Sequence, residues 1–181
     1  WQAVSMKQGF KYTKRLARID VKRNNRVKDY MRKTARSIIN LCMEQKIGTL
    51  VVGYNKDFKR SINLGKKTNQ QFTQIPFGLL REYLYNLCEQ YGIEYVEQEE
   101  SYTSKASFFD QDELPTWKPE KEAYAFSGKR ICRGLYQTGK GFIVNADVNG
   151  ALNILRKSNL IDMTILQGKG CLAHPQRVRI V

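Results

Sequence analysis

The sequence has 181 residues, of which 41% are hydrophobic, and this combination favours a folded domain with its own core over a disordered chain. Lys and Arg outnumber Asp and Glu by 31 to 17, and the formal net charge of +14 favours a polyanionic partner. No apolar run reaches the roughly 18 residues that a membrane span requires, so nucleic acid rather than a membrane is the expected partner.

Basic residues are concentrated in the N-terminal segment, residues 1–46. Its first forty positions hold twelve Lys and Arg against only Asp20 and Asp29. Asn25 is suited to cap a helix that runs to about Gln45, with an apolar stripe on one face and basic side chains on much of the rest. The candidate nucleic-acid ligands on this helix are Arg23, Arg26, Lys28, Arg32, Lys33 and Arg36. A merely solvated basic face explains the same pattern equally well.

A near-continuous β-branched run, Ile47–Tyr54, predicts a strand that is buried on both faces in the middle of an α/β sheet. The polar stretch after it interleaves basic side chains with Phe58 and Phe72, a composition that can hold a nucleic-acid backbone and stack bases. Its candidate ligands are Lys56, Lys59, Arg60, Lys66 and Lys67. A flexible surface loop accounts for this composition at least as well.

Pro76 and Gly92 delimit the next predicted helix, since proline suits a first helical position and glycine a helix end. A second strand is predicted from Ile93 to about Glu99, and it ends in acidic residues that continue to Glu100. Ligands of open α/β sheets bind at the carboxyl edge of the strands. We therefore expect these acids to lie at a binding edge.

Residues 101–140 break the regular pattern with prolines and glycine-rich turns, and we interpret them as an insertion with one hairpin near Lys129–Val144. The four cysteines lie far apart and form no C-x-x-C pair, so neither a disulfide framework nor a zinc site is expected. The N-terminus, Trp1-Gln2-Ala3, has no secretory signal pattern. These features favour a reducing, cytoplasmic setting.

An amphipathic helix opens at Asn145-Ala146-Asp147, directly after a short β-like run. Exposed N–H groups in a first helical turn stabilise a carboxylate. Asp147 can therefore stand at this position for a purely structural reason, as part of the helix cap. The acids at the end of the earlier strand favour another explanation, in which Asp147 and Glu100 share a cation. His174 is the only histidine and lies in the predicted tail, residues 158–181, where we interpret it as a bystander.

Four stretches together resemble the C-terminal half of the TnpB (OrfB) family of transposon-encoded proteins. They are Lys22–Tyr30, Ile47–Asn55, Glu99–Lys105 and Asn145–Ile154, and they occur in the family's order. The resemblance covers roughly residues 22–157. It implies an α/β fold of the RNase H-like (RuvC-like) type, with a mixed sheet flanked by helices and a basic N-terminal helix. The nuclease core would span residues 47–157.

The resemblance also implies a DNA endonuclease that is directed by a guide RNA and uses three carboxylates with Mg²⁺ or Mn²⁺. Asp147 matches the last of the three acids. In many relatives the second acid ends the strand that here contains Gly53, where no acid stands. We predict that Glu100 replaces it, with Glu99 as the alternative, because strand alternation points Glu99 the other way.

Asp147 and Glu100 are thus the expected metal ligands. Asn145 and Asn149 are expected to donate hydrogen bonds that orient the Asp147 ligand. Lys105, in the third matching stretch, is a further candidate for contact with the nucleic acid.

Two more features depart from the family pattern. The family's zinc ribbon is missing from residues 104–144, because Ala106 stands where a cysteine is expected and Cys132 is alone, so we expect no zinc and a metal-free hairpin in its place. The first catalytic Asp is not found, because Trp1–Ile19 does not resemble a strand and Asp20 lies in basic sequence that is expected to be helical.

Three hypotheses remain open. The chain is a piece of a nuclease completed by an upstream segment, with guide RNA and target DNA as partners, or a remnant of the same family that binds RNA or DNA without cutting. A small ribosome-associated or structural RNA-binding protein would explain the charge but not the carboxylates at the strand ends.

Overall fold

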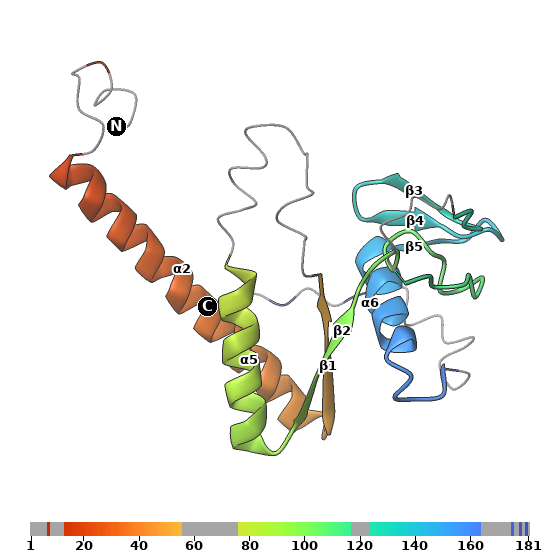
Figure 1. The fold of residues 1–181 in the computed structure, drawn as a ribbon, viewed down its shortest axis with the longest axis horizontal. Helices are drawn as coiled ribbons and strands as arrows, with labels where there is room; N and C mark the ends of the chain where they lie inside the picture. The colour runs from red at the N-terminus through yellow and green to blue at the C-terminus, as the bar shows by residue number, and fades with distance from the viewer. Residues whose placement is uncertain are drawn as a thin grey trace. The chain divides into compact units, whose positions relative to one another are not determined.

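The computed structural model describes residues 13–55, 76–116 and 124–163, together with Lys7, Pro175, Val178 and Ile180. The elements are α2 (Lys14–Glu44), β1 (Thr49–Tyr54), α5 (Phe77–Tyr91), β2 (Glu94–Glu99), β3 (Lys129–Cys132), β4 (Leu135–Gln137), β5 (Ile143–Asn145) and α6 (Ala146–Lys157) (Figure 1). They form two compact units, one with α2 and α5 and one with the strands and α6. This mixture of helices and strands confirms an α/β protein. None of the described helices is long and apolar enough to cross a membrane.

Helix α2 begins much earlier than the sequence predicted. Its cap is Thr13, whose hydroxyl oxygen accepts a hydrogen bond from the Leu16 N–H at 3.2 Å. The predicted start at Asn25 is wrong, because residues 14–24 contain no Gly or Pro and are rich in Lys, Arg and other residues that favour helix. Asp20 lies inside α2, as expected.

Helices α2 and α5 pack side by side in the first unit (Figure 1). The buried side chains of α2 follow one stripe at intervals of three or four residues: Met31, Ala35, Ile39 and Cys42. Leu84 and Cys88 form the buried stripe of α5. Gly92 ends α5 in the left-handed conformation, with φ 67°, which confirms its predicted role.

Both helices end on the same kind of backbone hydrogen bond. The N–H of Ile47 donates to the carbonyl of Cys42 at 2.8 Å, and the N–H of Ile93 donates to the carbonyl of Cys88 at 2.9 Å. Each bond satisfies a carbonyl in the last helical turn and directs the chain into the strand that follows.

Strands β1 and β2 run parallel, with Thr49 opposite Glu94 and Tyr54 opposite Glu99. The sequence predicted that β1 is buried on both faces, but all of its residues are only half-buried. Within the described chain this sheet has only two strands, so its faces are narrow and the side chains of β1 keep part of their exposure.

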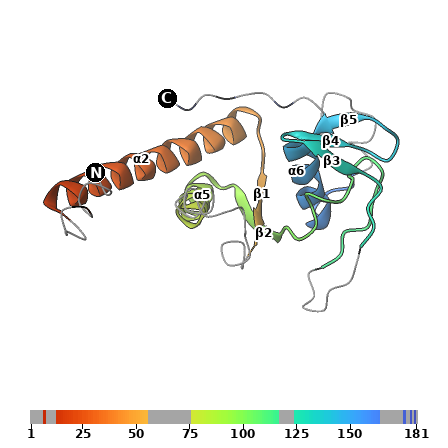
Figure 2. The ribbon, with the colours of Figure 1, turned by 90° about the horizontal axis from the view of Figure 1, so that it is seen from above.

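The three-stranded antiparallel sheet β3-β4-β5 takes the place of the single predicted hairpin. Tyr136, Val144 and Ala146 form its buried cluster, against which Phe109 packs. Helix α6 contacts β1 and β2 of one sheet and β4 and β5 of the other (Figure 2). It is therefore the element that joins the two sheets of this unit.

Candidate active site

Glu100 lies at the carboxyl end of the parallel strand pair. Its N–H donates to the carbonyl of Tyr54 at 3.2 Å, so the pairing of β2 with β1 extends one residue beyond β2. The Glu100 side chain reaches over Gly53 of the neighbouring strand. A Cβ atom at position 53 would lie 2.6 Å from Glu100 Oε2 and 2.7 Å from Ile154 Cδ1, so only glycine leaves this space open.

Glu99 is held by other groups. Its Oε2 accepts a hydrogen bond from Lys157 Nζ at 2.5 Å and its Oε1 accepts one from the Ser101 N–H at 2.6 Å. Burial raises the pKa of Glu99, but the hydrogen bonds from Lys157 and Ser101 and the charge of Lys157 outweigh this, so the pKa lies below its usual value. These bonds give Glu99 a structural partner for each carboxylate oxygen.

Asp147 lies in the first turn of α6 and is exposed. The helix is capped by Asn145, whose Oδ1 accepts hydrogen bonds from the N–H groups of Asp147 at 2.9 Å and Val148 at 3.0 Å. Asn145 was expected to donate to the Asp147 ligand, but as the helix cap it accepts these bonds and fixes the backbone of Asp147. The Asp147 carboxylate itself accepts no hydrogen bond from any other described residue.

Asn149 and Asn153 are fully buried and bind the loop that follows Glu100. Asn149 accepts from the Phe108 N–H at 2.9 Å and donates to the Ala106 carbonyl at 2.8 Å, and Asn153 donates to the carbonyls of Thr103 at 2.9 Å and Ala106 at 2.8 Å. Asn149 was expected to orient Asp147. Its hydrogen bonds run to the loop instead, because the amide is buried under residues 103–108.

Lys157 completes this face of α6, because it follows Asn153 by four residues as Asn153 follows Asn149. Besides Glu99, its ammonium group donates to the carbonyls of Ser101 at 3.2 Å and Pro115 at 3.3 Å. One helix thus carries Asp147 and also holds the backbone directly after Glu100. The sequence analysis missed Asn153 and Lys157, although their four-residue spacing from Asn149 was a usable sign of a polar helix face.

Two carboxylates tie this loop to the three-stranded sheet. They lie in the region where the family has a zinc ribbon that this sequence lacks. Asp112 accepts from the N–H groups of Ser107 at 2.8 Å and Ser127 at 3.0 Å and from the Ser127 hydroxyl. Asp110 accepts from the Ser107 hydroxyl and the Gly139 N–H, both at 2.6 Å. We call Ser107, Asp110, Asp112 and Ser127 the carboxylate link.

Tyr136 packs beside the carboxylate link. Its hydroxyl donates to the Lys105 carbonyl at 2.8 Å, which adds another bond between the sheet and the loop. Burial, together with the charges of Asp112 and Asp110, raises the pKa of Tyr136 to about 12. The phenol therefore stays protonated and keeps its donor at any physiological pH.

We expect Asp112→Asn to lower the free energy of unfolding of this unit by about 2–3 kcal/mol, because an amide NH₂ cannot accept the bonds that the carboxylate accepts. The control is Glu113→Gln, which removes the same charge from the exposed neighbouring residue and should change stability by less than about 0.5 kcal/mol. Urea denaturation measures both variants. Equal losses of stability in the two variants would show that the hydrogen bonds of the carboxylate link do not account for the effect.

The carboxylate link also predicts loss of stability in acid. Burial raises the pKa of Asp110, but hydrogen bonds from Ser107, Gly139 and Lys140 and the charge of Lys140 lower it to a net value below normal. The pKa of Glu99 is lowered as well. A carboxyl group with a lowered folded-state pKa stabilises the fold above its unfolded pKa, about 3.9 for Asp and 4.3 for Glu.

This contribution is lost as the pH falls through the folded-state pKa. We therefore expect the urea concentration at the unfolding midpoint of the wild-type chain to decrease when the pH is lowered below about 4. The fall should be smaller in the double variant Glu99→Gln and Asp110→Asn, and an equal fall in both proteins would contradict the prediction.

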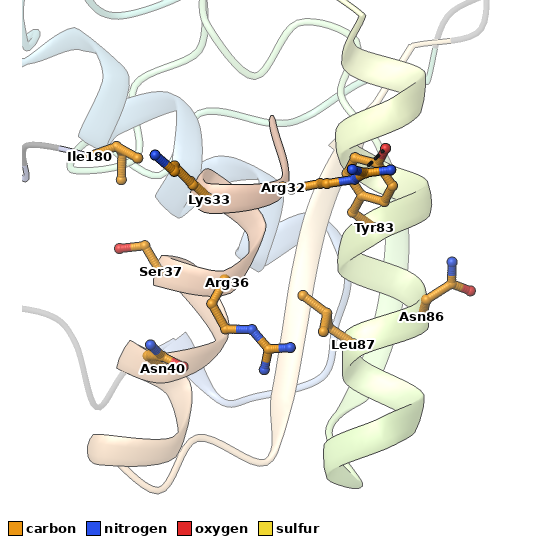
Figure 3. A pocket seen from close by; sticks show the side chains of 9 residues that line it. All are labelled: Arg32, Lys33, Arg36, Ser37, Asn40, Tyr83, Asn86, Leu87 and Ile180. Carbon is orange, nitrogen blue, oxygen red and sulfur yellow. Dashed lines mark hydrogen bonds between the residues drawn. The ribbon is translucent and has the colours of Figure 1, made fainter. Parts of the chain in front are cut away.

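The predicted basic ligands on α2 divide into two groups. Arg23, Arg26 and Lys28 form the first group and Arg32 and Arg36 the second, and all five are exposed. The Arg32 Nε donates to the Tyr83 hydroxyl at 3.2 Å (Figure 3), and an Arg36 guanidinium nitrogen donates to the Tyr91 hydroxyl at 2.7 Å. The second pair of arginines thus contributes to the packing of α2 on α5.

Of the remaining basic candidates, Lys33 forms an exposed ion pair with Asp29 at 3.4 Å. The Lys105 ammonium lies 5.9 Å from the ring centre of Tyr102. The five candidates of the polar stretch lie outside the described residues: Lys56, Lys59, Arg60, Lys66 and Lys67. Their role as nucleic-acid ligands, like that of the whole set, stays a prediction.

Family models match two parts of the sequence. The model OrfB_IS605, described as "Probable transposase", matches residues 3–59, and the model of the Cas12f1-like TNB domain matches residues 77–154. A comparison with curated protein sequences finds no match.

Among solved structures, the chain is similar to the cryo-EM structure of a Cas12f1-sgRNA-target DNA complex, with a TM-score of 0.55 and 19% sequence identity. The likeness covers 88% of this chain and 39% of that chain, so this chain spans well under half of the other protein. At this level of identity the likeness shows a shared fold.

Proposed function

Because this chain belongs to the TnpB (OrfB) family of transposon-encoded proteins, we propose that it is the C-terminal, RuvC-like portion of an RNA-guided DNA endonuclease. The proposed core spans residues 47–157 and takes an RNase H-like fold. The parallel pair of β1 and β2, packed against α6, and the fold likeness to Cas12f1 support this fold. Guide RNA and target DNA are the proposed partners.

The observation that carries the proposal is the position of the Glu100 carboxylate over Gly53. The family resemblance implies that many relatives carry their second acid at the end of the strand that here contains Gly53. Glu100 brings a carboxylate from the adjacent strand to the same place, and the glycine supplies the room for it. Of the two adjacent glutamates, Glu100 is therefore the proposed catalytic acid, because its carboxylate lies over Gly53.

Asp147 is the other proposed metal ligand. Ile154 approaches Gly53 beside Glu100, and it follows Asp147 by seven residues, or about 10 Å along the axis of α6 at about 1.5 Å per residue. To share ions, the side chains of Asp147 and Glu100 would have to reach toward each other across this distance. Carboxylate oxygens that accept few other bonds, as in Asp147, suit Mg²⁺ or Mn²⁺.

The metal would supply positive charge that activates water and neutralises the leaving oxygen of phosphodiester hydrolysis. The protein's part is to hold the two acids in place. Asn145 fixes the backbone of Asp147, while Asn149, Asn153 and Lys157 fix the loop after Glu100. Both acids are thereby tied to the same helix.

The test is DNA cleavage by the protein expressed from its full reading frame, with RNA transcribed from the transposon end. We expect a plasmid that carries the matching target to be cut only when both the RNA and Mg²⁺ or Mn²⁺ are present. Cutting that persists in EDTA, or no cutting with any matched RNA, would contradict the proposal.

One observation favours a second function, that of a nucleic-acid-binding remnant. In the parts of the chain that the structure describes, no three His, Cys, Asp or Glu side chains form a group that could hold a metal ion. A protein with two of three acids would bind RNA or DNA through its basic surface without cutting. In that case affinity should fall steeply between 50 and 200 mM salt while no cleavage product forms.

A further inference from the structure

A groove with a volume of about 650 Å³ runs between α2 and α5, inside the first unit (Figure 3). Its walls carry three basic side chains, Arg32, Lys33 and Arg36, and none of its described lining residues is acidic. The volume lies in the range of small-molecule sites and is large enough for about one nucleotide. We call this feature the helix groove.

The two arginines of the helix groove are held in place by tyrosine side chains of α5. The guanidinium of Arg32 lies 5.5 Å from the ring centre of Tyr83, and that of Arg36 lies 5.2 Å from the ring centre of Tyr91. Each arginine donates one hydrogen bond to its tyrosine and keeps further N–H donors for a ligand. Because these long side chains are already ordered, an anion would bind them at a reduced cost in entropy.

The helix groove also offers polar side chains that no other residue in the described parts of the chain binds. They are Ser37, Asn40 and Asn86, whose side chains make no hydrogen bond with any other described residue. An amide presents donors and an acceptor together, as the edge of a nucleobase does. Leu87 and Ile180 add apolar surface on which the flat face of a base can pack.

We propose that the helix groove binds a single-stranded segment of nucleic acid. The phosphates would lie on Lys33 and the two arginines, and an unpaired base would lie against the amides and the apolar surface. A single strand fits this chemistry better than a duplex, because the base edges and faces of a duplex are already paired and stacked. The site does not involve Glu100 or Asp147, so it stands or falls independently of the proposed cleavage.

The test is fluorescence anisotropy with a 12-nucleotide RNA and a DNA of the same sequence. The groove variant Lys33→Ala, Asn40→Ala, Asn86→Ala removes side chains whose only hydrogen bond or ion pair among the described residues is the exposed pair of Lys33 with Asp29. We expect the groove variant to bind at least one of the two strands about tenfold more weakly than wild type. Circular dichroism checks that α2 and α5 remain folded.

The matched control carries Lys14→Ala, Asn24→Ala and Asn25→Ala. It also removes one Lys and two Asn from exposed positions of the first unit, but none of the three lines the helix groove. We expect it to lose at most about twofold in affinity. The strand whose binding separates the two variants, RNA or DNA, is then the ligand.

Any one of three results would overturn the proposal. The first is that the groove variant binds both strands as well as the control does. The second is that poly-glutamate displaces the oligonucleotide as effectively as unlabelled strand does, and the third is that photo-cross-links avoid the part of α5 around Tyr83. Each would show that general charge, or another surface, accounts for binding.

Discussion

Cleavage by the Glu100→Gln variant is expected to fall by about 10³-fold or more, whereas the Glu99→Gln variant should stay within about tenfold of wild type. Both changes replace one carboxylate by an amide of the same shape, and the two residues are adjacent. They differ in surroundings, because Glu99 is bonded to Lys157 and Ser101 while Glu100 reaches over Gly53. The assay is single-turnover cleavage of target DNA by the RNA-loaded protein from the full reading frame.

Glu99→Gln should also lower the stability of the fold. Glu99→Gln leaves the ammonium of Lys157, which is largely buried, without its charged partner, and we expect a loss of about 1–2 kcal/mol in the free energy of unfolding. The assignment would be reversed if Glu99→Gln abolished cleavage and Glu100→Gln did not.

Gly53→Ala is expected to reduce cleavage by about 10²-fold, without removing any acidic residue. The added Cβ would lie 2.6 Å from the Glu100 carboxylate, closer than the two atoms can approach, so the carboxylate must move. The same Cβ would lie 2.7 Å from Ile154 Cδ1, and we expect this overpacking to cost about 1–3 kcal/mol of stability. Cleavage rates and urea denaturation measure the two effects.

The control is Gly48→Ala, because no atom lies within 4 Å of a Cβ placed there and the backbone is not left-handed. Its cleavage rate and stability should match wild type within error or improve slightly. The double variant Gly53→Ala, Ile154→Val, which removes Cδ1, should regain part of the stability while cleavage stays low. Recovery of cleavage in that double variant would show that packing against Ile154, and not displacement of Glu100, caused the loss.

Sequence patterns predicted the elements whose ends carry a local marker. Gly92 marks the end of α5, and Asn145 marks the start of α6 with Asp147 in its first turn. The start of α2 was missed because the cap, Thr13, precedes a basic stretch whose apolar stripe is weak. A local pattern reports a helix end well only where the cap and the stripe occur together.

The interactions that build the candidate site could not be predicted in this way, because they join distant parts of the chain. Asn149 binds the backbone of Phe108 across 41 residues, and Arg36 binds Tyr91 across 55. Sequence shows that such side chains are polar but does not show which partner each one meets. For the same reason Asn149 was interpreted as a partner of Asp147, its neighbour in sequence, rather than of the loop.

The pairing of β1 with β2 selects between the two adjacent glutamates. Gly53 lies opposite Gln98, and the N–H of Glu100 bonds to Tyr54 just beyond the last pair. A slip of β2 by one residue would bring Glu99 to that position and turn every side chain of the strand to the opposite face. An insertion or deletion at Ile93, between the helix end and the strand, would therefore disable the proposed site while leaving every acid in the sequence.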